Sequence, residues 1–217
     1  MDNWDKFIQK KIKKLIKHND TIVDVGVNFG VYLDFFNTLI SEEGRIFCYD
    51  LNEICISSLK SNYKQEHISI EQIAISDSDG SSFYYDGGRF GYHGTNIVGV
   101  NAANDVTTKL GSIETKRLDT IFKETEKINL IKIDVEGAEL KVLDGMVTIF
   151  DKIDYILLEC HHDNDWEKIL KIINKNNFVI FDLENNNIKT ENPANRIYQI
   201  LLINQKKLED FKKANIS

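Results

Sequence analysis

Acidic residues recur where short runs of β-branched and apolar residues end. Asp24, Asp50, Asp134 and Glu159 each stand at or near the end of such a run, and Ser76 ends another. An acid at the end of a buried strand is costly unless it binds something or takes part in chemistry. We therefore take these side chains as the first candidates for binding and catalysis.

The stretch TIVDVGVNFG, residues 21–30, places a glycine-bearing turn directly after the first of these acids. A dinucleotide site needs the pattern Gly-x-Gly-x-x-Gly, whose middle glycine lets the backbone approach a pyrophosphate. Here Asn28 stands between Gly26 and Gly30, so we expect a ligand without a pyrophosphate. The N-terminus of the following helix favours an anionic group, and Asp24 suits an ammonium. Together they fit the amino-acid end of a methionine derivative.

Residues at the ends of the second and third apolar runs can supply the contacts that a nucleoside needs. Asp50 is placed to accept hydrogen bonds from a ribose diol, and Leu51 follows it directly. Ala74 and Ile75 can lie against an adenine ring. A ribose, an adenine and a methionine-like zwitterion without phosphates make up S-adenosylmethionine.

Acids and a histidine stand at the ends of the fourth and fifth apolar runs. Neighbouring parallel strands end at one edge of a sheet, so Asp134, Glu136, Glu159 and His161 are expected to share a cleft. Methyl transfer to a hydroxyl needs the nucleophile and the methyl group held together and one proton removed. We expect Asp134, Glu159 and His161 to be catalytic, with Asp134 or His161 as the proton acceptor.

The same cleft allows alternative interpretations. Carboxylate oxygens and an imidazole can hold Mg²⁺, Mn²⁺ or Zn²⁺, with Asp134, Glu159 and His161 as ligands, and a bound cation would orient two vicinal hydroxyls of a sugar. We do not favour this metal site. Glu139 is expected to be solvated or to cap a helix, and His162 is expected to be exposed.

Short β-branched runs alternate with helical patterns over most of the chain. Strands are expected at residues 21–25, 45–50, 68–76, 128–135, 154–160, 178–184 and 196–204. Helices are expected at residues 29–40, 52–64, 138–150 and 164–176. This alternation predicts a doubly wound α/β fold whose mostly parallel sheet is covered on both faces and binds ligands beyond the carboxyl ends of its strands.

Five blocks follow one another along roughly residues 20–160: VDVGVNFG, CYDLN, IAISDSDG, IKIDVEGAELKVLDG and LLEC. The most specific is residues 131–145, with the core Asp-x-Glu-Gly-x-Glu and a trailing Leu-x-Gly. In order and spacing the blocks resemble the FkbM-type S-adenosylmethionine-dependent methyltransferases. The resemblance implies a seven-stranded sheet whose last strand is antiparallel, and an enzyme that O-methylates a hydroxyl of a sugar, a glycan or another small molecule.

The chain departs from that family at two positions. Val27 stands where the family usually has alanine, which a loop can absorb. Asp50 stands where the family usually has glutamate, often before a proline. Because aspartate is one methylene shorter, the ribose contact requires a small shift of the backbone or the ligand.

Two segments lie outside the regular alternation. Residues 1–19 are expected to form an amphipathic helix that docks its apolar stripe on the methyltransferase domain of residues 20–217. Residues 77–117 are glycine-rich and are expected to form an insertion or lid. The candidates for contacting the methyl acceptor are Tyr92, His93 and Asn96, with Arg89 beside them, and Glu136.

Composition narrows the class of protein. The formal net charge of −7 argues against a nucleic-acid binder. The three cysteines show neither pairing nor metal spacing, which favours a reducing compartment. No signal peptide is visible, and no apolar run approaches the ~18 residues that a membrane span needs. We expect a cytoplasmic monomer or homodimer that acts on a small-molecule or glycan acceptor.

Two other functions fit a sheet of this kind. A nicotinamide-dependent reductase is one, and the missing middle glycine of the first turn argues against it. A catalytically silent module that keeps the cofactor pocket is the other, and the acids clustered at the strand ends argue against that.

Overall fold

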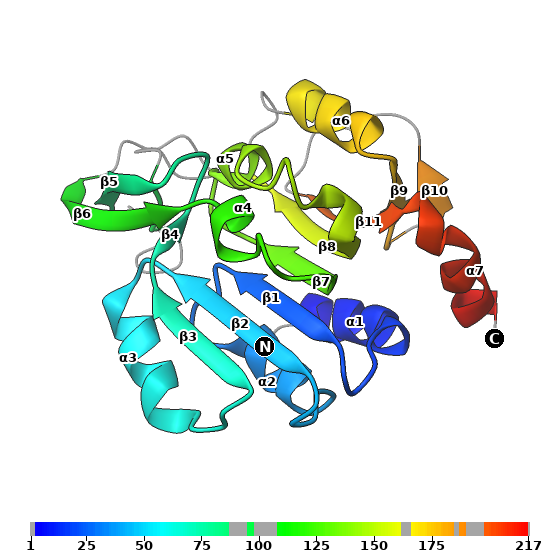
Figure 1. The fold of residues 1–217 in the computed structure, drawn as a ribbon, viewed down its shortest axis with the longest axis horizontal. Coiled ribbons are helices and arrows are strands. Elements are labelled where there is room, and N and C mark those ends of the chain that lie inside the picture. Colours follow the sequence, from blue (N-terminus) through cyan, green and yellow to red (C-terminus); the bar gives the residue numbers. More distant parts are fainter. Residues whose placement is uncertain are drawn as a thin grey trace.

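The computed structural model describes residues 3–86, 95–97, 108–161, 166–184, 187–189 and 198–216. Within these ranges, one sheet of eight strands has the order β10-β9-β11-β8-β7-β1-β2-β3 (Figure 1). Its strands are β1 (Thr21–Val25), β2 (Arg45–Asp50), β3 (Ile68–Gln72), β7 (Ile128–Ile133), β8 (Ile153–Cys160), β9 (Phe178–Asp182), β10 (Asn187–Lys189) and β11 (Tyr198–Asn204).

The pairing of the strands confirms the expected mostly parallel sheet. β3, β2, β1, β7 and β8 pair in parallel, whereas β11 pairs antiparallel with both β8 and β9. The edge strand β10 was not predicted, because its three residues carry no pattern long enough to recognise. It pairs antiparallel with β9 and makes the sheet eight-stranded.

The predicted strand at residues 68–76 is wrong as a single element. β3 ends at Gln72, and Ala74–Ile75 forms β4 in a second sheet of order β4-β6-β5. Its other strands are β5 (Gly80–Tyr85) and β6 (Lys109–Lys116), which pair antiparallel. After β3 the chain leaves the edge of the main sheet, and β4 pairs in parallel with β6. The described part of residues 77–117 thus contains the antiparallel pair β5 and β6, which extends from β4 (Figure 1).

Helices connect the strands and are shorter than the patterns predicted. They are α1 (Asn3–Ile12), α2 (Val31–Asn37), α3 (Glu53–Asn62), α4 (Leu118–Ile121), α5 (Glu139–Asp144), α6 (Trp166–Lys175) and α7 (Leu208–Ile216), with short 3₁₀ turns η1 (Lys13–Leu15), η3 (Phe150–Lys152) and η5 (Gln205–Lys207). α5 ends at Asp144, well before residue 150, and Gly145 follows it. A Cβ on Gly145 would lie 2.0 Å from the Ser76 carbonyl oxygen, so the close approach of α5 to the end of β4 requires glycine here.

Alternating residues of the central strands feed two separate apolar cores. On β8, Ile156 and Leu158 face one core, and Tyr155 and Leu157 face the other. The first core packs α4, α5 and α6 against the sheet, and the second packs α1, α2, α3 and α7 against the opposite face. The expected docking of the N-terminal apolar stripe is seen in α1, whose Ile8 and Ile12 are fully buried.

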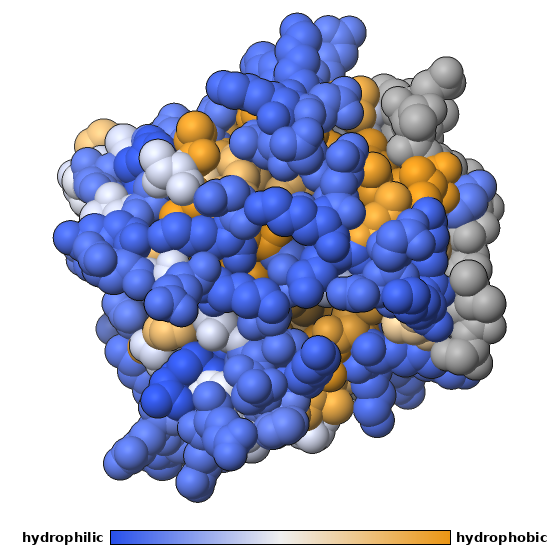
Figure 2. All heavy atoms as spheres, turned by 45° about the vertical axis from the view of Figure 1, so that its right-hand side comes forward, coloured by the Kyte–Doolittle hydropathy of each residue, from blue (hydrophilic) through white to orange (hydrophobic). Residues whose placement is uncertain are grey.

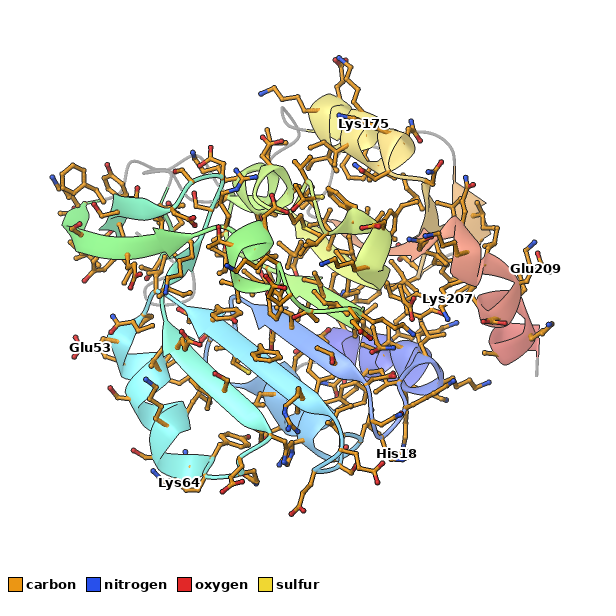
Figure 3. The ribbon with its side chains drawn as sticks, viewed as in Figure 1. His18, Glu53, Lys64, Lys175, Lys207 and Glu209 are labelled. Carbon is orange, nitrogen blue, oxygen red and sulfur yellow. The ribbon has the colours of Figure 1, made fainter. Side chains whose placement is uncertain are left out.

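Most charged side chains point outward. The face drawn in Figure 2 is dominated by hydrophilic residues, with apolar ones showing between them. In Figure 3, Glu53, Lys64, Lys175 and Glu209 extend from the rim of the fold. Among the described helices, none has the length and apolar character to cross a bilayer. Against this pattern, the charged residues buried at the carboxyl ends of β1, β7 and β8 are exceptional.

Candidate active site

A cleft opens beyond the carboxyl ends of β1, β2 and β4. It encloses about 580 Å³ counted to its open mouth, a volume in the range of small-molecule sites. The predicted site residues that line it are Gly26, Asn28, Asp50, Leu51, Ala74, Ile75, Asp134 and Glu136. The lining residues that sequence analysis missed are Val25, Tyr49, Ile73, Thr95, Ile97, Val135 and Ala138.

The glycine turn after β1 has a shape that few other residues permit. Gly26 has a φ of 84°, and a Cβ there would lie 1.8 Å from the Asp134 carbonyl oxygen. Asn28 also has positive φ, at 50°, which asparagine tolerates better than most residues. The turn therefore brings the end of β1 against the end of β7 and presents Asn28 to the cleft.

Asp50 braces this turn from the neighbouring strand. One carboxylate oxygen accepts a hydrogen bond from the Asn28 backbone N–H and the other from the Asn52 N–H, both at 2.8 Å. Burial raises the pKa of Asp50, while these two hydrogen bonds oppose the rise. The short aspartate side chain thus bonds the turn itself, and each oxygen keeps the capacity for a second hydrogen bond.

Two predicted cofactor residues lie behind the cleft wall. Asp24 and Gly30 do not line the cleft. Asp24 is fully buried, and its Oδ1 lies 3.6 Å from the ammonium of Lys132. Burial raises the pKa of Asp24 to about 6, although Lys132 opposes that rise. Any contact of Asp24 with a cofactor ammonium stays a prediction.

Lys132 is a charged residue of the site that sequence analysis missed. Its ammonium donates a hydrogen bond to Asp134 at 3.1 Å and lies 5.0 Å from the centre of the Tyr32 ring. Burial alone would lower the pKa of Lys132, but the carboxylates of Asp134 and Asp24 raise it well above its ordinary value. Lys132 is therefore a permanent cation inside the sheet.

Strand periodicity explains why so many polar residues meet on one face. Side chains two apart on a strand point the same way, so Lys132 and Asp134 share the face of the second core, which packs α1 and α2. Asp24 stands opposite Lys132 in the β1–β7 register, and Glu159 stands opposite Gln199 in the β8–β11 register. The sequence could have revealed Lys132, because the motif Ile-Lys-Ile-Asp places it between two apolar residues of a buried strand.

An imidazole lies at the centre of the acidic residues. His161 is buried, and its Nε2 lies 3.5 Å from a Glu136 oxygen, 3.5 Å from a Glu159 oxygen and 3.8 Å from an Asp134 oxygen. Its Nδ1 is 2.6 Å from Glu139 Oε1. We call Asp134, Glu136, Glu139, Glu159 and His161 the acid–imidazole cluster.

Glu139 corrects an expectation from the sequence. It is not solvated: it is 3% exposed, and it accepts a hydrogen bond from the Gly137 N–H at 3.0 Å in addition to its contact with His161. The turn that precedes it contains Glu136 with a φ of 55° and Gly137 with a φ of 104°. A non-glycine residue at positive φ is strained, and such strain concentrates at functional sites.

Electrostatics divide the roles within the cluster. Burial alone would lower the pKa of His161, but its hydrogen bond with Glu139 and the surrounding carboxylates raise it to about 9. Burial raises the pKa of Glu159 to about 7, helped by Asp134, and burial likewise raises that of Glu136 to about 7. At neutral pH the imidazole is therefore a cation, and these two glutamates are the groups poised to exchange a proton.

Ligand atoms of Asp134, Glu136 and His161 all lie within 4.8 Å of one another. This spacing would suit a divalent cation, with Glu136 in the place expected for Glu159. A metal site therefore stays an alternative interpretation, as it was from the sequence.

The candidates for contacting the methyl acceptor are only partly covered. Arg89, Tyr92 and His93 lie outside the described residues, as does His162. Asn96 is buried and forms an isolated β-bridge with Tyr85. Its neighbours Thr95 and Ile97 line the cleft, whereas Asn96 does not.

A match to a known domain identifies the family. The methyltransferase FkbM domain matches residues 24–180. The chain belongs to the FkbM methyltransferase family. The expected family is confirmed, and with it the expected methyl donor, S-adenosylmethionine. The matched range contains the cleft and the acid–imidazole cluster, but neither Gln199 nor the N-terminal helix α1.

One curated relative of this FkbM protein is the hexuronic acid methyltransferase AglP of Haloferax volcanii. The two are 24% identical over 165 residues, which cover 73% of this chain and 63% of the relative. The chain therefore spans less than two thirds of the length of that relative.

Solved structures share the fold of this FkbM protein. SMU.1697c of Streptococcus mutans, in complex with SAH, is 11% identical with a TM-score of 0.53, over 94% of this chain and 98% of that one. An rRNA methylase of Streptococcus thermophilus is 10% identical with a TM-score of 0.51, over 91% and 93%. Fibrillarin of Aeropyrum pernix, with natively bound S-adenosyl-L-methionine, is 14% identical with a TM-score of 0.50, over 91% and 74%. At such identities the likeness shows the fold alone, and it confirms the doubly wound α/β class.

Proposed function

We propose that the protein transfers the methyl group of S-adenosylmethionine to an oxygen of a sugar or glycan. The observation that carries this proposal is that the acid–imidazole cluster adjoins the cleft. Asp134 and Glu136 belong to the cluster and also line the cleft. The likeness to a hexuronic acid methyltransferase supports a sugar acceptor and makes hexuronic acids the first class to test.

The cofactor is proposed to lie in the cleft in the orientation that the sequence suggests. The turn of residues 26–30 would hold the methionine end, with Asp24 behind it. Asp50 and Leu51 would contact the ribose, and the apolar side chains of Ala74 and Ile75 would border the adenine. Asp134 and Glu136, which also line the cleft, would then border the methyl donor.

The reaction is an in-line displacement at carbon. A lone pair of the acceptor oxygen attacks the methyl carbon, the carbon–sulfur bond breaks, and its electron pair stays on sulfur as the thioether of S-adenosylhomocysteine. The hydroxyl proton is proposed to go to the pair Glu136 and Glu159, whose pKa values of about 7 suit a base at neutral pH. His161 was expected as a proton acceptor, but an imidazolium has no free lone pair, so we assign it the role of stabilising charge.

The acceptor class is tested with isotope-labelled S-adenosylmethionine and a panel of hexuronic acid and neutral glycosides. Mass spectrometry should find label on a sugar, and fragmentation should place it on an oxygen. A hexuronic acid offers both hydroxyl and carboxylate oxygens, and only the hydroxyl needs a base. Label on protein or RNA, with every sugar unlabelled, would refute the sugar acceptor.

Several finer predictions accompany this proposal. The cytoplasmic location, the state of monomer or homodimer and the lid formed by residues 77–117 stay predictions. The three cysteines are buried, and the reducing compartment expected from their spacing stays a prediction. A catalytically silent module is the second candidate, and it would bind S-adenosylhomocysteine while forming no product with any acceptor.

A further inference from the structure

A chain of hydrogen bonds joins the N-terminal helix to the acid–imidazole cluster. The Trp4 indole N–H on α1 donates to Gln199 Oε1 at 3.1 Å, and Gln199 Nε2 donates to Glu159 Oε2 at 2.8 Å. The other oxygen of Glu159 is the one that lies 3.5 Å from His161 Nε2. Trp4 and Gln199 stand 195 positions apart, and both lie outside the range matched by the FkbM domain.

The chemistry of the three groups fixes the direction of this chain. An indole N–H can only donate, so the atom of Gln199 that it meets must be the amide oxygen. That leaves the amide NH₂ group for Glu159, which as a carboxylate can only accept. Gln199 is 8% exposed, so its amide is largely shielded from water. Trp4 thereby selects the one amide orientation that supports an ionised Glu159.

We propose that Gln199 and Trp4 are positioning residues of the active site, which hold one oxygen of Glu159 so that the other faces His161. The proposal rests on the proposed role of the cluster in accepting a proton. It makes α1 part of the active site as well as a brace for the sheet.

Other groups also act on Glu159, and the test must separate them from Gln199. Asp134 raises the pKa of Glu159, whereas His161 and Lys132 lower it, as does the hydrogen bond from Gln199. Glu136 and the Tyr32 hydroxyl are further titratable groups that interact with it. A variant at Gln199 that adds no charge leaves these groups in place and removes the contacts of its amide with Glu159 and the Tyr32 hydroxyl.

The decisive variant is Gln199→Met, which keeps the length of the side chain, removes the donor NH₂ and adds no charge beside Glu159. If Gln199 acts as a donor, the midpoint of the Glu159 titration should rise by about one pH unit or more, because a hydrogen bond to a charged group is lost. If Gln199 serves only as packing, the midpoint should not move. The midpoint is read by NMR of protein with ¹³C at the glutamate δ-carboxyl, with Glu159 assigned through Glu159→Gln.

A second pair of variants tests Trp4 and guards against a misfolded Gln199→Met protein. Trp4→Phe keeps an aromatic ring stacked on Phe7, whose ring centre lies 5.3 Å away, and removes the N–H. The matched control is Trp166→Phe, because the Trp166 N–H has no hydrogen-bond partner among the described residues. Trp4→Phe should raise the Glu159 midpoint by less than Gln199→Met does, and Trp166→Phe should leave it unchanged.

Enzyme activity supplies an independent readout. The rising limb of the kcat/KM profile should move to higher pH together with the NMR midpoint in Gln199→Met, with unchanged affinity for S-adenosylhomocysteine. An unmoved Glu159 midpoint in both Gln199→Met and Trp4→Phe would overturn the positioning role, whatever the acceptor is. Conversely, a moved midpoint in a protein that methylates no sugar would leave the positioning role intact and count against the proposed function.

Discussion

Single residues of the cluster act through the charges that they impose on one another. Glu139 is buried and its Oε1 lies 2.6 Å from His161 Nδ1, so among the carboxylates it contributes most to keeping the imidazole protonated. Gly26 acts through its lack of a side chain, because it lets β1 meet the backbone of Asp134. Each of these residues can be tested by itself.

Replacing Glu139 should release His161 from the charged state. In Glu139→Gln the hydrogen bond can persist but the negative charge is lost, so the pKa of His161 should fall from about 9 toward its ordinary value of about 6.5. Imidazole proton NMR across the pH range measures the shift. Glu43→Gln, which changes a carboxylate 3.3 Å from the exposed His18, is the control and should leave the His161 titration as it was. An unchanged His161 titration in Glu139→Gln would contradict the assigned role.

A methyl group at Gly26 should be far more damaging than one at another glycine of positive φ. A Cβ at Gly26 would lie 1.8 Å from a backbone oxygen, whereas at Gly80, with a φ of 144°, nothing lies within 4 Å. Gly80→Ala should therefore cost only backbone strain, about 1 kcal/mol, and Gly26→Ala should cost several times that amount and weaken binding of S-adenosylhomocysteine. Urea unfolding and calorimetry measure both effects, and equal losses for the two variants would count against the close approach at Gly26.

Strands and turns hold these residues in place, and the sequence predicted most of the strands. Short β-branched and apolar runs predicted the strands that carry Asp24, Asp50 and Glu159 and the strand that precedes Asp134, and the acids at or near their ends marked the site. Burial of Glu139 could not be predicted, since it depends on a strained turn that sequence periodicity does not reveal. The break after Gln72 was missed for a similar reason: its signal is the long-range pairing of β4 with β6.

A buried cation on β7 lies beside an acid of β1. In Lys132→Met the fully buried Asp24 would lose its cation and Asp134 would keep only His161, so the free energy of unfolding should fall by about 3 kcal/mol. Adding Asp24→Asn should restore part of the loss. Lys127→Met removes a surface pair with Asp154 at 2.8 Å and should cost less than about 1 kcal/mol. If the two lysine variants lose equal stability in urea unfolding, the buried pair has no special role.

Across the whole molecule, the cluster links stability to pH. The folded pKa values of Glu136 and Glu159 are raised from 4.5 to about 7, and that of His161 from 6.5 to about 9. A raised pKa means that the folded state binds the proton more tightly than the unfolded state does. Its contribution to stability is therefore complete below the ordinary pKa and is lost as pH rises through the folded value.

The protein without ligand should accordingly become less stable from about pH 5 to about pH 9. The glutamates account for the lower part of this window and His161 for the upper part. Urea unfolding at intervals of pH measures the loss. The double variant Glu136→Gln/Glu159→Gln should flatten the lower part of the curve, and stability that rises with pH in the wild type would contradict the assigned shifts.

The cofactor is proposed to bind in the cleft and the proton to go to Glu136 and Glu159, and one comparison tests this division of roles most directly. Methyl transfer from S-adenosylmethionine to hexuronic acid and neutral glycosides is measured for the wild type and for Glu136→Gln/Glu159→Gln, beside calorimetry with S-adenosylhomocysteine. We predict that the variant binds S-adenosylhomocysteine as the wild type does and transfers methyl groups to a sugar hydroxyl about 10²–10⁴-fold more slowly. Transfer to a hydroxyl at the wild-type rate by the variant, or a wild type that does not bind S-adenosylhomocysteine, would contradict it.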